Sequence, residues 1–221
     1  MNLPTNPSTF PSGETNFLID GPSGQLELLS FAAKGPAKGV AIICHPHPLQ
    51  EGTMHNKVVH TLSRAFHRKD LHAIRFNYRG VGKSQGQYGN SVGEIQDLMA
   101  VLSWADTVLD NPKIWLAGFS FGAYIAAMGA TQHACQQLFT VAPAVTHQPY
   151  SEMPLVSCPW TVIQGEADEV VSPSEVFTWF DRHAEQQSQM TLIKLPNASH
   201  FFHGDLIVLR TLVEDAFVEH S

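Results

Sequence analysis

The pentapeptide Gly118-Phe119-Ser120-Phe121-Gly122 contains a serine whose surroundings suit nucleophilic chemistry. It follows the apolar run Lys113–Ala117 and precedes Ala123–Met128, which is rich in strong helix formers. In a strand-turn-helix context, the pattern G-x-S-x-G forms a tight turn that projects the serine hydroxyl from the top of a sheet. Side chains in place of the two glycines would crowd the neighbouring strand and helix. The segment therefore predicts a nucleophilic Ser120, although such a pattern alone arises by chance in about one chain in ten to twenty.

A serine hydroxyl is a poor nucleophile until a base takes its proton, and the base needs an orienting carboxylate. In this strand-turn-helix arrangement both partners follow the serine in chain order. The carboxylate candidates lie in residues 165–171, directly after an apolar run. We choose Asp168, which lies three residues beyond the turn glycine and just before an apolar pair that can anchor the loop. Glu166 and Glu169 are the alternatives, and a merely acidic surface loop would be the interpretation if no histidine partner existed.

The histidine is expected after the last strand of the sheet. Residues 195–204 form a loop with two histidines, His200 and His203. We choose His200, because it lies within the loop itself. His203 stands at the start of the final helix, where a neutral polar or supporting role is easier to accommodate.

Acyl transfer also needs hydrogen-bond donors aimed at the oxygen that becomes negatively charged. One expected donor is the backbone N–H of Phe121, which directly follows the nucleophile. The second is expected from the loop His45-Pro46-His47-Pro48, after another apolar strand. Proline has no N–H, so the backbone N–H of His47 is the predicted donor. We interpret His45 as a packed or hydrogen-bonded loop residue rather than a catalytic imidazole.

Strands and helices alternate from residue 39 onward, which predicts a doubly wound, mostly parallel sheet covered by helices on both faces. Two N-terminal strands joined by a Gly-Pro-Ser-Gly turn should extend one edge in antiparallel fashion. The fold class is therefore α/β. The predicted strands are 16–20, 25–32, 39–44, 72–78, 113–117, 137–142, 160–164 and 190–195, and the predicted helices are 56–68, 91–109, 173–184 and 205–218, with another directly after the pentapeptide.

Length and composition predict one domain over residues 14–221 with a flexible N-terminal tail over residues 1–13. The net charge of −7 gives no basic surface for nucleic acid. No run approaches the roughly 18 apolar residues of a membrane span, and the N-terminus lacks the features of a signal peptide. Three cysteines without metal-ligand spacing favour a reducing, cytoplasmic location. The oligomeric state, monomer or homodimer, stays open.

With these residues assembled, the chain resembles the α/β-hydrolase superfamily, and is most similar to the small lidless bacterial serine hydrolases with a His-Pro-His-Pro loop. The resemblance covers the chain from about residue 39 to its end. The matching blocks are residues 45–48, 52–59, 75–84, 118–122, 165–171 and 199–201. It implies a Ser120–His200–Asp168 triad, with Phe121 and His47 as oxyanion donors and no cofactor.

The resemblance also implies that Asn77–Ser84 is a supporting turn, in which Arg79 anchors neighbouring loops. One departure is Glu51, where many relatives would have a small residue, and its charge would lie beside the site. The interval Pro143–Pro159 is too short for a large cap domain. An uncapped site is expected to be shallow and open, which favours small or extended soluble acyl substrates.

The expected function is hydrolysis of a carboxylic ester or thioester of a small soluble substrate through an acyl-enzyme on Ser120. An acyltransferase or, lowest in rank, a peptidase could use the same triad. A non-catalytic binding protein with this fold is an alternative of another class. A metal enzyme is a further rival, because His45, His47, His55 and His60 raise the local histidine density, but their spacing matches no metal motif.

Overall fold

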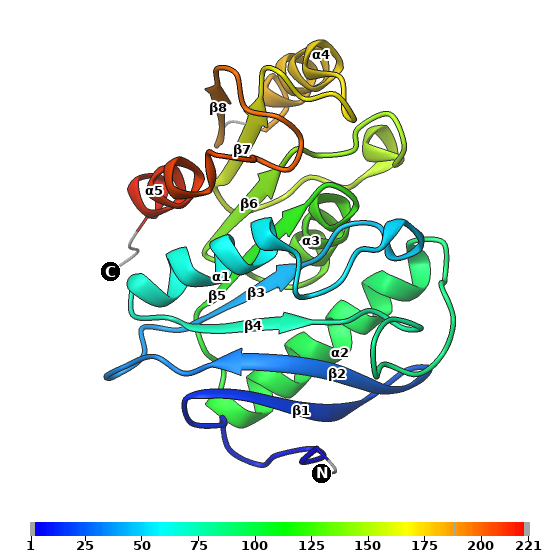
Figure 1. Cartoon of the computed structure of the whole chain (residues 1–221), viewed down its shortest axis with the longest axis vertical. Helices are drawn as coiled ribbons and strands as arrows, with labels where there is room; N and C mark the ends of the chain where they lie inside the picture. The colour runs from blue at the N-terminus through cyan, green and yellow to red at the C-terminus, as the bar shows by residue number, and fades with distance from the viewer. Residues whose placement is uncertain (1–2, 188, 219–221) are drawn as a thin grey trace.

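The computed structural model describes residues 3–187 and 189–218, which form an eight-stranded sheet with helices on both faces (Figure 1). The strand order is β1-β2-β4-β3-β5-β6-β7-β8. The strands are β1 (Glu14–Gly21), β2 (Gly24–Phe31), β3 (Val40–Cys44), β4 (His72–Phe76), β5 (Ile114–Phe119), β6 (Gln137–Val141), β7 (Trp160–Gly165) and β8 (Met190–Leu195).

The six strands from β3 to β8 pair in parallel, whereas β1 pairs antiparallel with β2, and β2 antiparallel with β4. This topology confirms the predicted α/β class with an antiparallel N-terminal edge. The central strands β3, β5, β6 and β7 are buried along their whole length, as expected for parallel strands covered on both faces. Because the six strands run the same way, the loops after their carboxyl ends gather at one edge of the sheet.

The helices form two layers. They are α1 (Lys57–Arg68), α2 (Val92–Leu109), α3 (Phe121–Gln132), α4 (Pro173–Ala184) and α5 (Leu206–Ala216). Apolar side chains of α1 and α5 share one buried cluster, and those of α2, α3 and α4 share the other. Figure 1 shows α1 and α5 in front of the sheet and α2 and α3 behind it. Asn56 begins α1 by accepting hydrogen bonds from the N–H groups of Val58 and Val59 through its side-chain oxygen.

The N-terminal segment was predicted as a flexible tail over residues 1–13, of which residues 1 and 2 lie outside the described part; the described residues of this segment contact the rest of the fold. The segment follows β1: the N–H of Asn6 donates to the carbonyl of Leu18 over 2.8 Å. The indole N–H of Trp104 on α2 donates to the carbonyl of Pro7, and the Phe10 ring stacks on His72 at 4.0 Å. The polar composition of this segment does not indicate these contacts. An aromatic ring and a backbone pairing with β1 nevertheless hold it against the rest of the fold.

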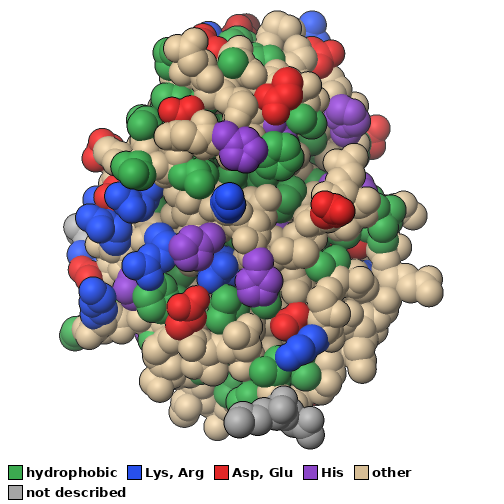
Figure 2. All heavy atoms as spheres, viewed as in Figure 1, with side chains coloured by type: hydrophobic (Ala, Val, Ile, Leu, Met, Phe, Trp, Pro, Cys, Tyr) green, Lys and Arg blue, Asp and Glu red, His purple; other side chains and the backbone are tan. Residues whose placement is uncertain are grey.

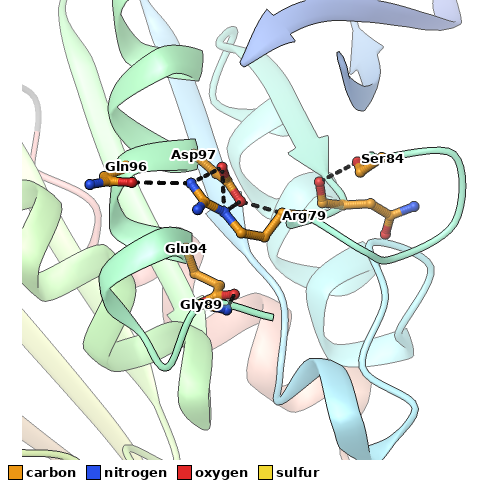
Figure 3. A network of polar contacts seen from close by, with 7 residues as sticks. Arg79, Ser84, Gly89, Glu94, Gln96 and Asp97 are labelled. Carbon is orange, nitrogen blue, oxygen red and sulfur yellow. Dashed lines mark hydrogen bonds and ion pairs between the residues drawn. The ribbon is translucent and has the colours of Figure 1, made fainter. Parts of the chain in front are cut away.

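Helix α2 is fastened to the turn after β4 by a buried ion pair between Arg79 and Asp97 (Figure 3). The guanidinium donates to both carboxylate oxygens of Asp97, which also accepts the backbone N–H of Arg79. Gly93 leaves room for this contact, because a Cβ there would lie 2.6 Å from the Arg79 guanidinium. Arg79 therefore anchors its loop as the sequence predicts, with Asp97 as the partner.

The surface of the face in Figure 2 mixes acidic, basic, histidine and apolar side chains rather than presenting one sign of charge. Within the ranges 3–187 and 189–218, no helix combines the length and hydrophobicity needed to cross a bilayer. In the same residues, no three side chains of His, Cys, Asp and Glu are placed to hold a metal ion together.

Candidate active site

Ser120 lies at the sharp junction between β5 and α3. Its backbone adopts φ 55° and ψ −116°, a conformation that L-residues rarely take and that marks stored strain at functional sites. The N–H of Ser120 donates to the carbonyl of Val141 on β6 over 2.9 Å, which holds the turn against the sheet. A Cβ on Gly118 would lie 2.0 Å from the carbonyl oxygen of Gly122, and one on Gly122 would lie 2.4 Å from that of Cys44. Both glycines are therefore required by close packing of strand against helix.

Asp168 lies in the loop after β7, and hydrogen bonds surround its carboxylate. One oxygen accepts the N–H groups of Val170 and Val171 at 2.9 and 2.7 Å. The other accepts the Gln164 amide at 3.0 Å and His200 Nδ1 at 2.8 Å. Burial by itself would raise the pKa of Asp168, but the hydrogen bonds from His200 and the loop N–H groups outweigh it and hold the pKa below its ordinary value. The carboxylate is therefore charged at neutral pH.

His200 follows β8 and faces Asp168, with its ring 5.0 Å from that of Phe119. Of the alternatives weighed from the sequence, Glu169 instead accepts the backbone N–H of His200 through its carboxylate, at 3.1 Å. The backbone N–H of His203 donates to the hydroxyl of Ser199. His203 lines a cavity to which Ser120 does not contribute. The structure therefore brings together the two residues chosen as acid and base.

The hydroxyl of Ser120 has no hydrogen-bond partner among the described residues. Hydrogen bonds between a nucleophile and its base are often long or poorly aligned without substrate and tighten in the complex. Because Nδ1 of His200 is bound to Asp168, the remaining ring nitrogen, Nε2, is the one that can serve a nucleophile.

His45 supports the loop after β3 from within. Its Nδ1–H donates to the carbonyl of Pro46 over 2.7 Å, and its Nε2 accepts the N–H of Tyr78 over 3.2 Å. Burial lowers the pKa of His45 from 6.5 to about 3, against the opposing effect of the hydrogen bond to Pro46. The ring is thus neutral with a fixed tautomer, in agreement with the interpretation of His45 as a structural residue.

The backbone N–H groups of His47 and Phe121 have no hydrogen-bond partner among the described residues. Phe121 is the first residue of α3, where an N–H has no helical acceptor. Gly52 lets the chain pass close beneath the His47 loop, since a Cβ there would lie 2.1 Å from the Pro46 carbonyl oxygen. The two residues and Ser120 line one cavity of about 320 Å³. The other lining residues are Gln50, Tyr88, Ala144, His147, Gln148, Val170 and Val171.

This geometry was compared with known proteins. The family model described as serine aminopeptidase, S33, matches residues 35–157, more than half of the chain. An alpha-beta serine hydrolase homologue from Coxiella burnetii is 44% identical and superposes with a TM-score of 0.90, over 95% of this chain and 100% of that one. The chain belongs to the α/β-hydrolase superfamily of serine hydrolases.

Further relatives agree with this assignment. A serine hydrolase without a lid from Xanthomonas campestris is 35% identical to this α/β-hydrolase, with a TM-score of 0.87 over 96% of this chain and 99% of that one. An uncharacterized protein from Rickettsia prowazekii is 36% identical over 193 residues, which are 83% of this chain and 80% of the relative. The hydrolase is thus similar to lidless members of the superfamily, as expected from its short interval between β6 and β7.

A second cavity of about 310 Å³ lies between residues 51–58 and residues 201–203. Its lining includes Glu51, the residue noted as a departure, together with Phe201 and His203. Glu51 has a left-handed backbone, with φ 58°, at the end of the short 3-10 helix Pro48–Gln50. Glu51 thus lines this second cavity and is not among the residues that line the cavity of Ser120.

Three polar residues that contact the site of the hydrolase were not singled out from the sequence. Gln164 hydrogen-bonds Asp168, and a polar residue that ends the apolar run of β7 is a signal that could have identified it. Tyr88 and Gln148 line the cavity of Ser120. They come from loops without a motif, so only the folded chain brings them to the site.

Proposed function

We propose that this α/β-hydrolase cleaves carboxylic esters or thioesters of small soluble substrates through an acyl-enzyme on Ser120. The observation that carries the proposal is the buried pair of Asp168 and His200, 2.8 Å apart, in the loops that follow β7 and β8. Ser120 lies at the same edge of the sheet, on the strained turn after β5. Membership of a serine hydrolase superfamily supports the same chemistry.

The proposed reaction has two halves. In the first, Ser120 Oγ attacks the carbonyl carbon while His200 Nε2 takes the hydroxyl proton, and this proton then passes to the departing alcohol or thiol as its bond to carbon breaks. In the second, water loses a proton to His200 and attacks the acyl-enzyme, and the proton returns to Ser120 as the acid leaves. Asp168 holds the imidazole in the tautomer with its proton on Nδ1 and stabilises the charged ring.

The oxyanion of each tetrahedral intermediate would bind to the N–H groups of His47 and Phe121. Both N–H groups have no partner among the described residues, and both residues border the cavity of Ser120. Donors that are already fixed in place need no rearrangement when the charge develops, which is why such sites contribute strongly to catalysis. The stiff His-Pro-His-Pro loop, braced by His45, would supply this rigidity.

The cavity of Ser120 has a volume of about 320 Å³, which suits the acyl group of a small substrate. An aminopeptidase would need a carboxylate to bind the substrate ammonium group, but the described residues that line this cavity include neither Asp nor Glu. This lining favours esters and thioesters over peptides as substrates.

We also propose a cytoplasmic location. The support is in the sequence, which has three cysteines, an odd number, without metal-ligand spacing. Fractionation of the native cells, with antibody detection of the protein, tests this placement: recovery with periplasmic or membrane markers would contradict it.

A panel of activated substrates tests the proposed function. The p-nitrophenyl esters of unbranched acids from acetate to dodecanoate, the matching thioesters and the p-nitroanilides would be compared by kcat/KM, with Ser120→Ala protein as the blank. We expect esters and thioesters to be hydrolysed, the anilides to be poor substrates, and kcat/KM to be higher for the short acyl groups than for dodecanoate. Equal rates for wild-type and Ser120→Ala protein would contradict the proposal.

A further inference from the structure

Two pairs of hydrogen-bonded side chains contribute residues to the wall of the Ser120 cavity, and the first is His47 with Tyr88. The backbone N–H of Leu49 donates to His47 Nδ1 over 3.2 Å. A backbone N–H can only donate, so Nδ1 is unprotonated and the neutral ring has its proton on Nε2. The hydroxyl of Tyr88 lies 3.3 Å from Nε2 and therefore accepts this proton.

A second hydrogen bond lies between Ser91 and Gln148. The Ser91 hydroxyl donates its single proton to the side-chain oxygen of Gln148, over 2.8 Å. The amide oxygen of Gln148 therefore faces Ser91.

Ser91 is held in place by its backbone as well as by its hydrogen bonds. It lies at the start of α2 with φ 71°, next to Asn90 with φ 52°. Such left-handed conformations at non-glycine residues are costly and cluster at functional sites. The buried ion pair of Arg79 and Asp97 fastens this end of α2 to the sheet, so the Ser91 hydroxyl has a fixed position from which to orient Gln148.

The hydrogen bond from Ser91 orients the amide of Gln148 and turns its NH2 group away from Ser91. Its oxygen faces Ser91, and its NH2 group has no acceptor among the described residues. The side chain is partly exposed and lines the same cavity as Ser120. A donor that is oriented by its neighbours and open to a ligand cavity is a recognition group for an acceptor on the ligand.

We propose that Gln148 is a specificity-determining residue that donates a hydrogen bond to an acceptor on the acyl group of the substrate. The preferred substrates are therefore esters or thioesters of short acids that contain a carbonyl, ether or carboxylate oxygen away from the scissile bond. Ser91 is a positioning residue, which acts through Gln148. This inference rests on the proposed function, because it assumes that the cavity receives the acyl group.

The apolar part of the lining supports a mixed acyl group rather than a wholly polar one. Phe121, Ala144, Val170 and Val171 face the cavity beside the polar residues. An acyl group with a short hydrocarbon stem would contact these side chains and present its oxygen to Gln148. A plain alkyl group of equal length would leave the amide NH2 without an acceptor, which lowers its relative rate.

A matched pair of substrates tests the proposal. The p-nitrophenyl esters of the 4-, 5- and 6-oxoheptanoic acids would be compared with esters in which a methylene group replaces the ketone oxygen at the same position. The two members have nearly the same shape, but only the ketone accepts a hydrogen bond. We expect the ketone to be preferred by about tenfold in kcat/KM at one position of the series at least. Equal kcat/KM at all positions would overturn the proposal.

Two glutamate variants separate hydrogen bonding from charge. Gln148→Glu keeps an oxygen for Ser91 and replaces the NH2 group by a second oxygen, so it cannot donate. The ketone preference should fall to about one or reverse. Gln50→Glu adds the same charge to the same cavity, but Gln50 is exposed and has no side-chain partner among the described residues. It should keep the wild-type preference, and a similar loss in both variants would contradict the role given to Gln148.

A binding measurement distinguishes failure of this inference from failure of the proposed function. Calorimetry on Ser120→Ala protein with the free oxo acids and their methylene analogues measures recognition without chemistry. Tighter binding of the oxo acids, lost in the Ser120→Ala/Gln148→Glu double variant, would support Gln148 even if no ester were hydrolysed. Equal binding of the two acids, with esters hydrolysed normally, would remove the inference and leave the proposed function intact.

Discussion

Asp168 Oδ2 and His200 Nδ1 lie 2.8 Å apart, and their side chains are 0% and 3% exposed. Two backbone N–H groups and the Gln164 amide also donate to the carboxylate. With four donors around it, the carboxylate cannot rotate without breaking hydrogen bonds in a buried site. The pair therefore fixes both the position and the tautomer of the imidazole.

Asp168→Asn should lower kcat by about 10⁴. The asparagine oxygen would keep the two backbone N–H groups, so its NH2 group would face His200 and the Gln164 amide. Opposite a donor, Nδ1 of His200 must accept, and the ring proton then moves to Nε2, where it blocks proton transfer from Ser120. Steady-state kinetics with a p-nitrophenyl ester measures the loss, and circular dichroism verifies that the variant is folded. Activity within about tenfold of wild type would contradict the assigned role.

His45 should make the stability of the protein fall in mildly acidic solution. Its pKa is about 3 in the folded protein and 6.5 as an ordinary value, so the unfolded chain binds the proton more readily. The contribution to stability is complete above pH 6.5 and is lost as the pH falls toward 3. Glutamine at position 45 gains no charge at low pH. The free energy of unfolding of the His45→Gln variant, measured in urea, should therefore fall less between pH 7 and pH 5 than that of the wild-type protein. The two proteins share all other histidines. Parallel profiles of unfolding free energy against pH would therefore disprove the effect of burial on the pKa of His45.

Gly122→Ala should destabilise the protein by about 4 kcal/mol, at the upper end of single substitutions. The added methyl would lie 2.4 Å from the carbonyl oxygen of Cys44, against backbone that cannot easily move. Gly35→Ala is the matched control, because a Cβ there meets nothing within 4 Å, and it should change stability by less than about 0.5 kcal/mol. Denaturant unfolding measures both, and similar costs at the two positions would refute the packing argument.

Asp97→Asn should cost about 3 kcal/mol or more of stability. The substitution leaves the buried guanidinium of Arg79 without its counter-ion. The pair of Arg68 and Glu214, at 2.9 Å, provides a more solvated comparison, with side chains that are 59% and 19% exposed. Because Glu214 also pairs with Arg210, Arg68→Gln should cost less than about 1 kcal/mol. A cost for Asp97→Asn no larger than that for Arg68→Gln would show that the ion pair does not hold α2 in place.

Much of the fold could be predicted from the sequence, because the parallel strands are apolar runs bounded by turn residues. The positions of Ser120, Asp168 and His200 after β5, β7 and β8 followed from the same pattern, since the loops after the carboxyl ends of parallel strands meet at one edge. The boundaries were less accurate: β5 continues through Gly118 and Phe119, because pairing with β3 and β6 extends the strand into the turn.

Contacts between distant segments could not be predicted from the sequence. Asp97 lies on an amphipathic helix where an acidic residue would ordinarily face water, and only the packing of α2 shows that it is buried against Arg79. Phe10 lies in a polar segment, and its stacking on His72 needs the tertiary structure. The hydrogen bonds of His47 with Tyr88 and of Ser91 with Gln148 each join distant loops, whose meeting no local pattern indicates.

The central claim is that Ser120 is a nucleophile activated by His200. A fluorophosphonate probe reacts with activated serines, and intact mass followed by peptide mapping locates the adduct. We expect one adduct per chain, on Ser120, no labelling of Ser120→Ala protein, and labelling slowed by several orders of magnitude in folded His200→Ala protein. Absence of labelling in folded wild-type protein, or undiminished labelling of Ser120 in His200→Ala protein, would contradict the account.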